Sequence, residues 1–253
     1  MDVLGEGMRD VAALADAVRA ADSVVALTGA GLSRASGVPT FRGEGGLYEE
    51  FDESAFALRR FRANPDAFWR DWLALHEHFF DESVAPNAAH DALATLEARG
   101  HLDAVLTQNV DGLHVAAGSD SVVHLHGTGS TATCRNCGDV VDVETANAVV
   151  ADTDAAPTCD CGGVYKPDTV LFGERLPPVA LAEARDRAAT ADVLLAAGSS
   201  LTVDPAASLP ATTRREGGRV AVVNLEPTRY EDAADVTLRD PVEDVLPTVV
   251  DAL

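Results

Sequence analysis

The chain has 253 residues, of which 47% are hydrophobic, and 41 acidic side chains outnumber 19 basic ones, giving a formal charge of −22. This length allows one large domain, or a large and a small one. The negative charge argues against nucleic acid and membrane surfaces as partners.

Lys166 is the only lysine. An acidic, lysine-poor composition indicates a halophilic source, because salt at about 1 M screens charge repulsion beyond roughly 3 Å. An acidic mesophilic protein would explain the charge but not the missing lysines.

The N-terminal segment does not resemble a secretory signal, because Asp2, Glu6 and Asp10 interrupt any apolar stretch. No run of about 18 apolar residues follows. We therefore expect a cytoplasmic protein. The sequence leaves the oligomeric state open, and a monomer is compatible with it.

Short apolar runs alternate with helical periodicity along much of the chain. In chain order the pattern predicts a helix (Met8 to Ala20), a strand (Ser23 to Leu27), a helix (Ala88 to Arg99), a strand (Asp103 to Leu106), a helix (Val179 to Ala189), two strands (Asp192 to Ala197 and Arg219 to Val223) and a last helix (Val242 to Leu253). This alternation predicts an α/β fold with a doubly wound, parallel, Rossmann-like sheet.

Two stretches interrupt the alternation, and we interpret both as insertions that form a smaller lobe. Residues 36–84 are rich in Phe, Trp and Arg, and residues 128–168 contain every cysteine. The large domain then comprises residues 1–35, 85–127 and 169–253. The cleft between the lobes is the expected ligand site. Within the second insertion, the Ala/Asp-rich run from Val149 to Pro157 is expected to be a flexible loop.

A glycine turn, Gly29-Ala30-Gly31, follows the first predicted strand. Its backbone N–H groups can approach a pyrophosphate that side chains would otherwise keep away. The six-residue dinucleotide fingerprint is incomplete, since Arg34 stands where its last glycine belongs. A tight strand-to-helix turn without a phosphate remains an alternative.

Polar residues also follow the second predicted strand, at the position where open parallel sheets contact ligands. These are Gln108, Asn109 and Asp111. The alternative is a simple turn in which Asn109 caps a helix. His126 follows after a spacer, and an imidazole with a pKa near 6.5 is suited to general base catalysis. A structural histidine is the alternative there.

The four cysteines are spaced as a C-x-x-C pair, Cys134 and Cys137, and a C-x-C pair, Cys159 and Cys161. Four thiolates predict one tetrahedral zinc ion (Zn²⁺), and because they leave no open position the site is structural. The short C-x-C spacing departs from the usual pattern. A disulfide pair or an iron–sulfur cluster is the alternative.

Three blocks together resemble the sirtuin family: Gly29 to Ser33, Thr107 to His114 with His124 to Gly127, and Gly198 to Leu201. The resemblance spans nearly the whole chain. It implies NAD as co-substrate and acetylated proteins as partners. It also implies that residues 36–84 contain a cofactor-binding loop and a helical insertion, although Thr40 replaces an acidic residue usual in that loop.

The resemblance further assigns roles to individual residues. His126 and Asn109 are implied to be catalytic. The residues implied to bind NAD are Gly29, Ala30, Gly31, Phe41, Arg42, Gln108, Asn109, Asp111, Gly198, Ser199, Ser200, Asn224, Glu226 and Val242. The residues implied to bind the acyl-lysine substrate are Val170, Phe172, Gly173, Glu174, Leu201 and Val203.

The implied reaction is NAD-dependent deacetylation of protein lysines, which releases nicotinamide and O-acetyl-ADP-ribose. Two alternatives remain open: mono-ADP-ribosylation of proteins on the same scaffold, and a non-catalytic NAD-binding regulatory module. Sirtuins that remove succinyl or malonyl groups use a Tyr and an Arg three residues apart. No tyrosine occurs between Phe61 and His90, so we expect an uncharged acyl group such as acetyl.

Overall fold

The structure is a computed structural model that describes residues 3–40, 46, 51–79 and 84–253. Its centre is a six-stranded sheet with the order β3-β2-β1-β7-β8-β9. The strands are β1 (Val24–Thr28), β2 (Ala104–Thr107), β3 (Val122–His124), β7 (Val193–Ala197), β8 (Arg219–Val223) and β9 (Val236–Leu238). All the pairings between them are parallel. The predicted doubly wound parallel sheet is therefore confirmed.

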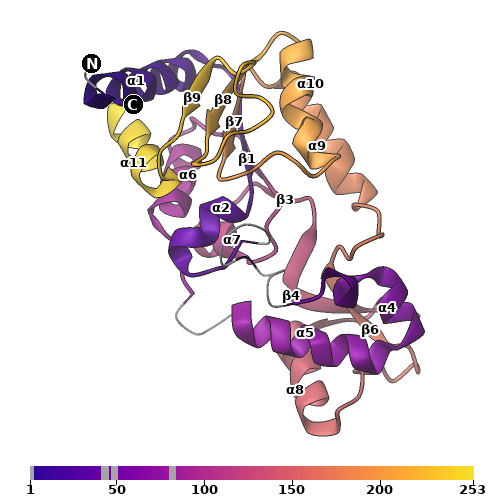
Figure 1. Ribbon diagram of the computed structural model, residues 1–253. Helices are drawn as coiled ribbons and strands as arrows, with labels where there is room; N and C mark the ends of the chain where they lie inside the picture. The colour runs from indigo at the N-terminus through magenta and orange to yellow at the C-terminus, as the bar shows by residue number, and fades with distance from the viewer. Residues whose placement is uncertain (1–2, 41–45, 47–50, 80–83) are drawn as a thin grey trace.

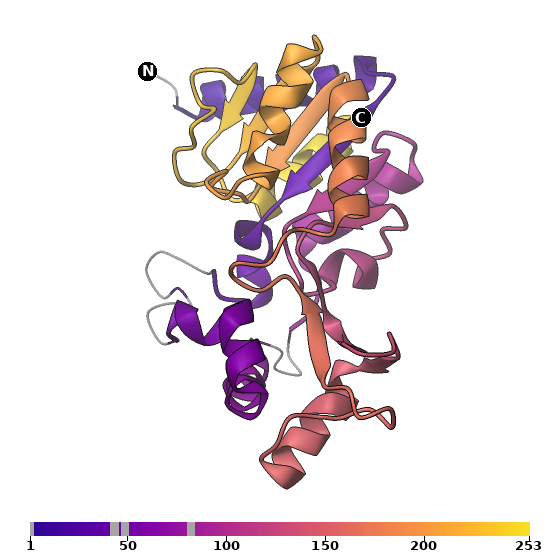
Figure 2. The ribbon, with the colours of Figure 1, turned by 90° about the vertical axis from the view of Figure 1, so that its right-hand side faces the viewer.

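Helices cover both faces of this sheet (Figures 1 and 2). One face packs against α1 (Val3–Ala20), α6 (Ala88–Ala98) and α11 (Val242–Ala252), and the other against α9 (Pro178–Thr190) and α10 (Leu209–Arg215). In β1, Val24 and Ala26 belong to the first core, whereas Val25 and Leu27 belong to the second. A strand buried on both faces has no polar face, which explains its continuous apolar sequence.

The predicted elements agree with the structure to within one residue at each end, except that α1 begins at Val3 and not at Met8. The edge strands β3 and β9 were not predicted, because three residues are too few to show a pattern. The flexible loop expected from Val149 was wrong. Residues up to Thr153 belong to α8 (Val143–Thr153), whose Val143, Ala146 and Val150 form a buried apolar stripe.

A smaller lobe lies below the sheet in Figure 1. It contains a three-stranded antiparallel sheet with the order β5-β4-β6, made of β4 (Gly127–Cys134), β5 (Val140–Asp142) and β6 (Tyr165–Thr169), together with α8, α4 (Leu58–Ala63) and α5 (Pro65–Phe79). Phe68, Trp69 and Trp72 of α5 share one core with Ala132 of β4 and Val143 of α8. The two sequence insertions therefore bury their apolar faces against each other.

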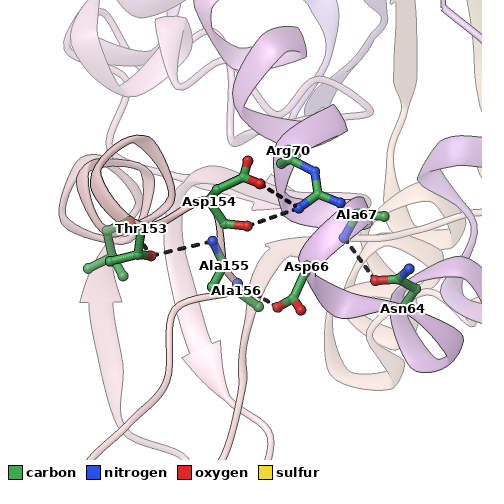
Figure 3. Close-up of polar contacts among 9 residues, drawn as sticks. Asn64, Asp66, Ala67, Arg70, Thr153, Asp154, Ala155 and Ala156 are labelled. Carbon is green, nitrogen blue, oxygen red and sulfur yellow. Dashed lines mark hydrogen bonds and ion pairs between the residues drawn. The ribbon is translucent and has the colours of Figure 1, made fainter.

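Polar contacts join the insertions at the edge of this core (Figure 3). Arg70 of α5 donates to the backbone oxygen of Asp154 at 2.9 Å and to its carboxylate at 3.2 Å. The Asp66 carboxylate accepts from the backbone N–H of Ala156 at 2.9 Å. Exposed ion pairs contribute only about 0–1 kcal/mol, so the aromatic core dominates the packing of the lobe.

Short helical turns complete the described elements: α2 (Ala30–Ser33), η1 (Arg34–Ser36), η2 (Glu53–Phe56), α7 (Leu113–Ala116) and η3 (Ala206–Ser208). Within the described residues, none of the helices has the combined length and apolar character needed to cross a membrane.

Candidate active site

The carboxyl ends of β1 and β7 lie side by side, where the strand order of the sheet reverses. Gly31 N–H donates to the oxygen of Gly198 at 2.8 Å. A Cβ atom on Gly31 would lie 2.8 Å from that oxygen, and one on Gly29 would lie 2.9 Å from the Cβ of Ser199. The glycines are therefore required by close backbone approach, at the position where Rossmann-like sheets bind dinucleotides.

Gln108 connects the Gly29–Gly31 turn after β1 and the Gly198–Ser199 turn after β7 to the end of β2. Its side-chain amide donates to the Ser199 hydroxyl at 2.8 Å and to the backbone oxygen of Thr28 at 3.2 Å. The ends of three neighbouring strands are thus held by one side chain. The structure brings together the predicted residues Gly29, Gln108 and Ser199.

Asn109 and Asp111 meet at a residue that our sequence analysis did not select, Ser33. The Asn109 amide donates to the Ser33 hydroxyl at 3.0 Å and to the oxygen of Gly29 at 3.1 Å. The Ser33 hydroxyl donates to the Asp111 carboxylate at 2.6 Å. Ser33 therefore fixes both side chains, and its polarity inside an otherwise apolar turn was the available sequence signal.

The alternative in which Asn109 caps a helix does not fit this geometry. The N-cap residue of α7 is Gly112, and the N–H of Leu113 is bound by the Asp111 carboxylate at 3.0 Å. Asn109 is buried and its side chain points to the glycine turn instead.

His126 has a defined orientation next to these residues. Its Nδ1 atom lies 2.9 Å from the backbone oxygen of Gln108. A carbonyl oxygen only accepts, so Nδ1 carries the hydrogen and Nε2 of the neutral ring keeps its lone pair. Burial lowers the pKa of His126, partly opposed by the hydrogen bond to Gln108. The side chain is therefore a neutral base at pH 7.

Two further histidines lie beneath the site. The rings of His90 and His114 are buried edge-to-face, with centroids 5.0 Å apart. His114 Nε2 lies 2.9 Å from the Thr28 hydroxyl. Burial, followed by the neighbouring His90 and His124, lowers the pKa of His114 to about 3. These rings are neutral packing groups under the polar site, and sequence alone did not indicate that Thr28 and His90 belong there.

The four cysteines converge on one point in the small lobe. Their sulfur atoms all lie within 4.8 Å of one another, with Cys134 and Cys161 at 3.5 Å and Cys137 and Cys159 at 3.6 Å. Four sulfurs about 2.3 Å from a tetrahedral zinc ion are themselves about 3.8 Å apart. The cluster therefore fits one structural zinc ion, as predicted.

The C-x-C spacing is accommodated by a turn. The N–H of Gly162, whose φ is 80°, donates to Cys159 O at 2.8 Å, and Cys159 N–H donates to Gly163 O at 2.8 Å. A Cβ on Gly163 would lie 2.5 Å from the Cys134 sulfur. A backbone hydrogen bond from Gly163 lowers the pKa of Cys161 to about 6, with a further contribution from the Asn136 amide, which favours the thiolate that binds metal.

A Sir2 family profile matches residues 29–205. The chain belongs to the Sir2 family. The sirtuin resemblance inferred from its motifs is thus confirmed. A relative from Haloarcula marismortui, "NAD-dependent protein deacetylase", is 51% identical over 95% of this chain and 94% of its own length. Another with the same name, from Sulfurisphaera tokodaii, is 42% identical over 90% and 89%. The Haloarcula relative is weak support for the predicted halophilic source.

Solved Sir2 structures are similar over almost the full chain. One that contains a deacetylated p53 peptide and 3'-O-acetyl ADP ribose has a TM-score of 0.87 at 36% identity, covering 94% of this chain and 96% of that chain. Another, which contains a p53 peptide and NAD+, has a TM-score of 0.85 at 36% identity with the same coverage.

Other predicted NAD-binding residues of this Sir2 protein lie further from His126 along the sheet. Asn224 follows β8, and its amide donates to the backbone oxygen of the exposed Glu226 at 2.8 Å. Ser200 is exposed beyond β7, whereas Val242 is buried in the apolar core at the start of α11. Phe41 and Arg42 lie outside the described residues. Assignment of these side chains to NAD stays a prediction.

The predicted substrate segment of this Sir2 protein follows β6. Phe172 pairs with the chain before α4, accepting from Leu58 N–H at 3.0 Å and donating to Phe56 O at 3.1 Å. Its side chain is exposed, as is that of Val203. Leu201 is fully buried with a φ of 53°, so it presents no accessible surface to a substrate in this structure. Val170, Gly173 and Glu174 are at least partly accessible.

Proposed function

We propose that this Sir2 protein is an NAD-dependent protein-lysine deacetylase and that acetylated proteins are its substrates. The observation that carries the proposal is the neutral His126, whose Nδ1 is bound by Gln108 O beside the Asn109–Ser33–Asp111 network. A base with a free lone pair at the switch point of a dinucleotide-binding sheet is suited to activating a ribose hydroxyl.

In this proposal, individual residues of the chain have separate roles in the reaction. His126 takes a proton at Nε2 from a ribose hydroxyl. Asn109 and Gln108 orient that ribose, and Asp111 holds the carboxamide of nicotinamide. Bound NAD supplies the ADP-ribose group that accepts the acetyl group once nicotinamide has left. Gly29, Gly31 and Gly198 allow the phosphates to approach the backbone.

An uncharged acyl group suits the helical insertion. Phe68, Trp69 and Trp72 are buried in the small-lobe core, and Arg70 is engaged by Asp154. None of these side chains offers a cation to a succinyl or malonyl carboxylate. Acetyl is therefore the favoured acyl group.

The same proposal includes the domain division and the location of the protein. Residues 1–35, 85–127 and 169–253 form the NAD-binding domain, while 36–84 and 128–168 form the small domain. The shared core of α5, α8 and β4 supports this division. The cytoplasm is the proposed location, where a reducing environment keeps four cysteines available for zinc.

The decisive experiment is an acetyl-lysine peptide assay in concentrated salt, with and without NAD. Loss of the acetyl group, release of nicotinamide and formation of O-acetyl-ADP-ribose should occur together and only when both substrates are present. Nicotinamide release with an unacetylated protein acceptor would support ADP-ribosylation instead. NAD binding without any turnover would support a regulatory module.

A further inference from the structure

The only lysine of the protein is buried behind the predicted substrate segment. Lys166 lies in β6, and its side chain is 7% exposed. The ammonium group contacts three oxygen atoms: Pro167 O at 2.8 Å, Thr169 O at 2.9 Å and the Glu174 carboxylate at 3.0 Å. An ammonium has three N–H donors, so its hydrogen-bonding capacity is filled.

Two of these acceptors, on Thr169 and Glu174, lie at the two ends of one short segment, residues 170–174. Thr169 precedes it, and Glu174 closes it. The Glu174 carboxylate oxygen that contacts Lys166 also accepts from Leu171 N–H at 3.1 Å, and Glu174 N–H donates to Leu171 O at 2.9 Å. The segment is thus folded around a single charged pair.

The same segment is joined to the catalytic region. Val170 N–H donates to the backbone oxygen of His126 at 2.8 Å. Movement of residues 170–174 would therefore disturb both the predicted substrate-binding surface and the strand end that carries the base. The one lysine of the protein is therefore buried where its charge is paired with the end of this segment.

We propose that Lys166 is a positioning residue: with Glu174 it forms a clamp that holds residues 170–174 closed, and acyl-lysine binding favours the closed clamp. This inference rests on the proposed function only in naming the substrate. If only one partner of a buried ion pair moves away, the other charge stays buried without a hydrogen-bonding partner, and this costs free energy. The clamp therefore opens as a unit.

A single lysine makes clamp opening measurable. Acetylation of Lys166 by an amine-reactive ester, followed by mass spectrometry, reports how often its ammonium reaches solvent, and the α-amino group serves as internal reference. An N-terminally blocked acetyl-lysine peptide at about ten times its Kd should slow Lys166 labelling about elevenfold, because only peptide-free protein opens. The same N-terminally blocked peptide with norleucine in place of acetyl-lysine has no amine and no acyl group, and it should leave the rate unchanged.

Removal of the charge partner tests the clamp without any substrate. Glu174→Gln should accelerate Lys166 labelling by about tenfold, the effect of losing one charge-assisted contact. Glu183→Gln is the matched control, since the exposed Glu183 pairs with Arg187 on α9, and the rate of Lys166 labelling in this variant should equal that of the wild type.

Steady-state kinetics separates positioning from general destabilisation. Lys166→Met should raise KM for the acetyl peptide about tenfold and leave KM for NAD unchanged, and Lys166→Arg should restore part of the loss.

Equal effects on both KM values would overturn the proposal. It would also be overturned if Lys166 in the wild type labels as fast as the α-amino group, or if neither peptide nor Glu174→Gln changes its rate. Absence of deacetylation by the wild type would reject the proposed function, while the Glu174→Gln labelling result would still decide the clamp.

Discussion

The Nδ1 atom of His126 is held 2.9 Å from the backbone oxygen of Gln108. This contact determines which ring nitrogen of the proposed base keeps its lone pair, and it ties the imidazole to the strand end that Asn109 and Asp111 follow. Orientation of a histidine by a backbone carbonyl adds no second charge to the site. The reactive nitrogen is therefore set by the main chain.

Replacement of this histidine should abolish turnover and spare folding. His126→Ala is expected to lower the rate of acetyl-peptide turnover by about 10²- to 10⁴-fold, the usual contribution of a positioned general base, while NAD still binds. His101→Ala is the control. The backbone N–H of His101 donates to Leu96 O, and this hydrogen bond does not depend on the side chain. Full activity of His126→Ala would contradict the proposed mechanism.

Ser33→Ala should weaken NAD binding. The change removes an acceptor from Asn109 and a donor from Asp111, and each lost hydrogen bond costs about 1 kcal/mol or more. We expect NAD affinity to fall by roughly 10- to 100-fold, measured by calorimetry. Ser130→Ala on the exposed face of β4 should bind NAD normally, and equal affinity in both variants would show that Ser33 is dispensable.

His114 should make folding stability depend on pH. Its folded pKa is about 3, below the usual 6.5, because burial and the neighbouring histidines disfavour its charged form. Between these values the unfolded chain binds the proton and the folded chain does not. Stability from this group is therefore complete above pH 6.5 and falls toward pH 3, by up to about 1.4 kcal/mol per pH unit.

Denaturant unfolding across this pH range, at constant salt, would measure that slope. His114→Gln should make the slope shallower by about one proton, and Ser130→Ala, which removes no titratable group, should leave it unchanged. An unaltered slope in His114→Gln would mean that other groups account for the acid sensitivity.

Zinc removal should unfold the small lobe. One zinc ion per chain is expected by elemental analysis, and Cys161→Ser or prolonged chelation should remove it. Because structural zinc contributes folding free energy directly, the aromatic core around Trp69 and Trp72 should lose its near-ultraviolet circular dichroism signal. A metal-free protein with an unchanged signal and Tm would contradict this role.

Local sequence determined the four inner strands of the large sheet, β2, β1, β7 and β8, and the helices α1, α6, α9 and α11. Residues of β1 are apolar at successive positions because both faces of that strand are covered, and this pattern can be recognised without the structure. The motif residues Asn109, Asp111 and His126 and the four cysteines were selected from the sequence because their chemistry belongs to the side chain itself. The structure brings the four sulfurs together, while the catalytic and NAD-binding roles stay predictions. The helical residues from Val149 to Thr153 were mistaken for a loop, because alanine and aspartate did not reveal the buried stripe of α8.

Tertiary structure alone decided which groups act together. Ser33 bridges Asn109 and Asp111, Gln108 reaches Ser199, and Lys166 closes on Glu174. Except in the last pair, the partners are far apart in sequence, and hydrogen bonds act over about 3 Å. Composition and spacing specify neither such distances nor the burial that makes them strong. The sequence by itself therefore determined the kind of chemistry, and the packing of distant segments determined its geometry.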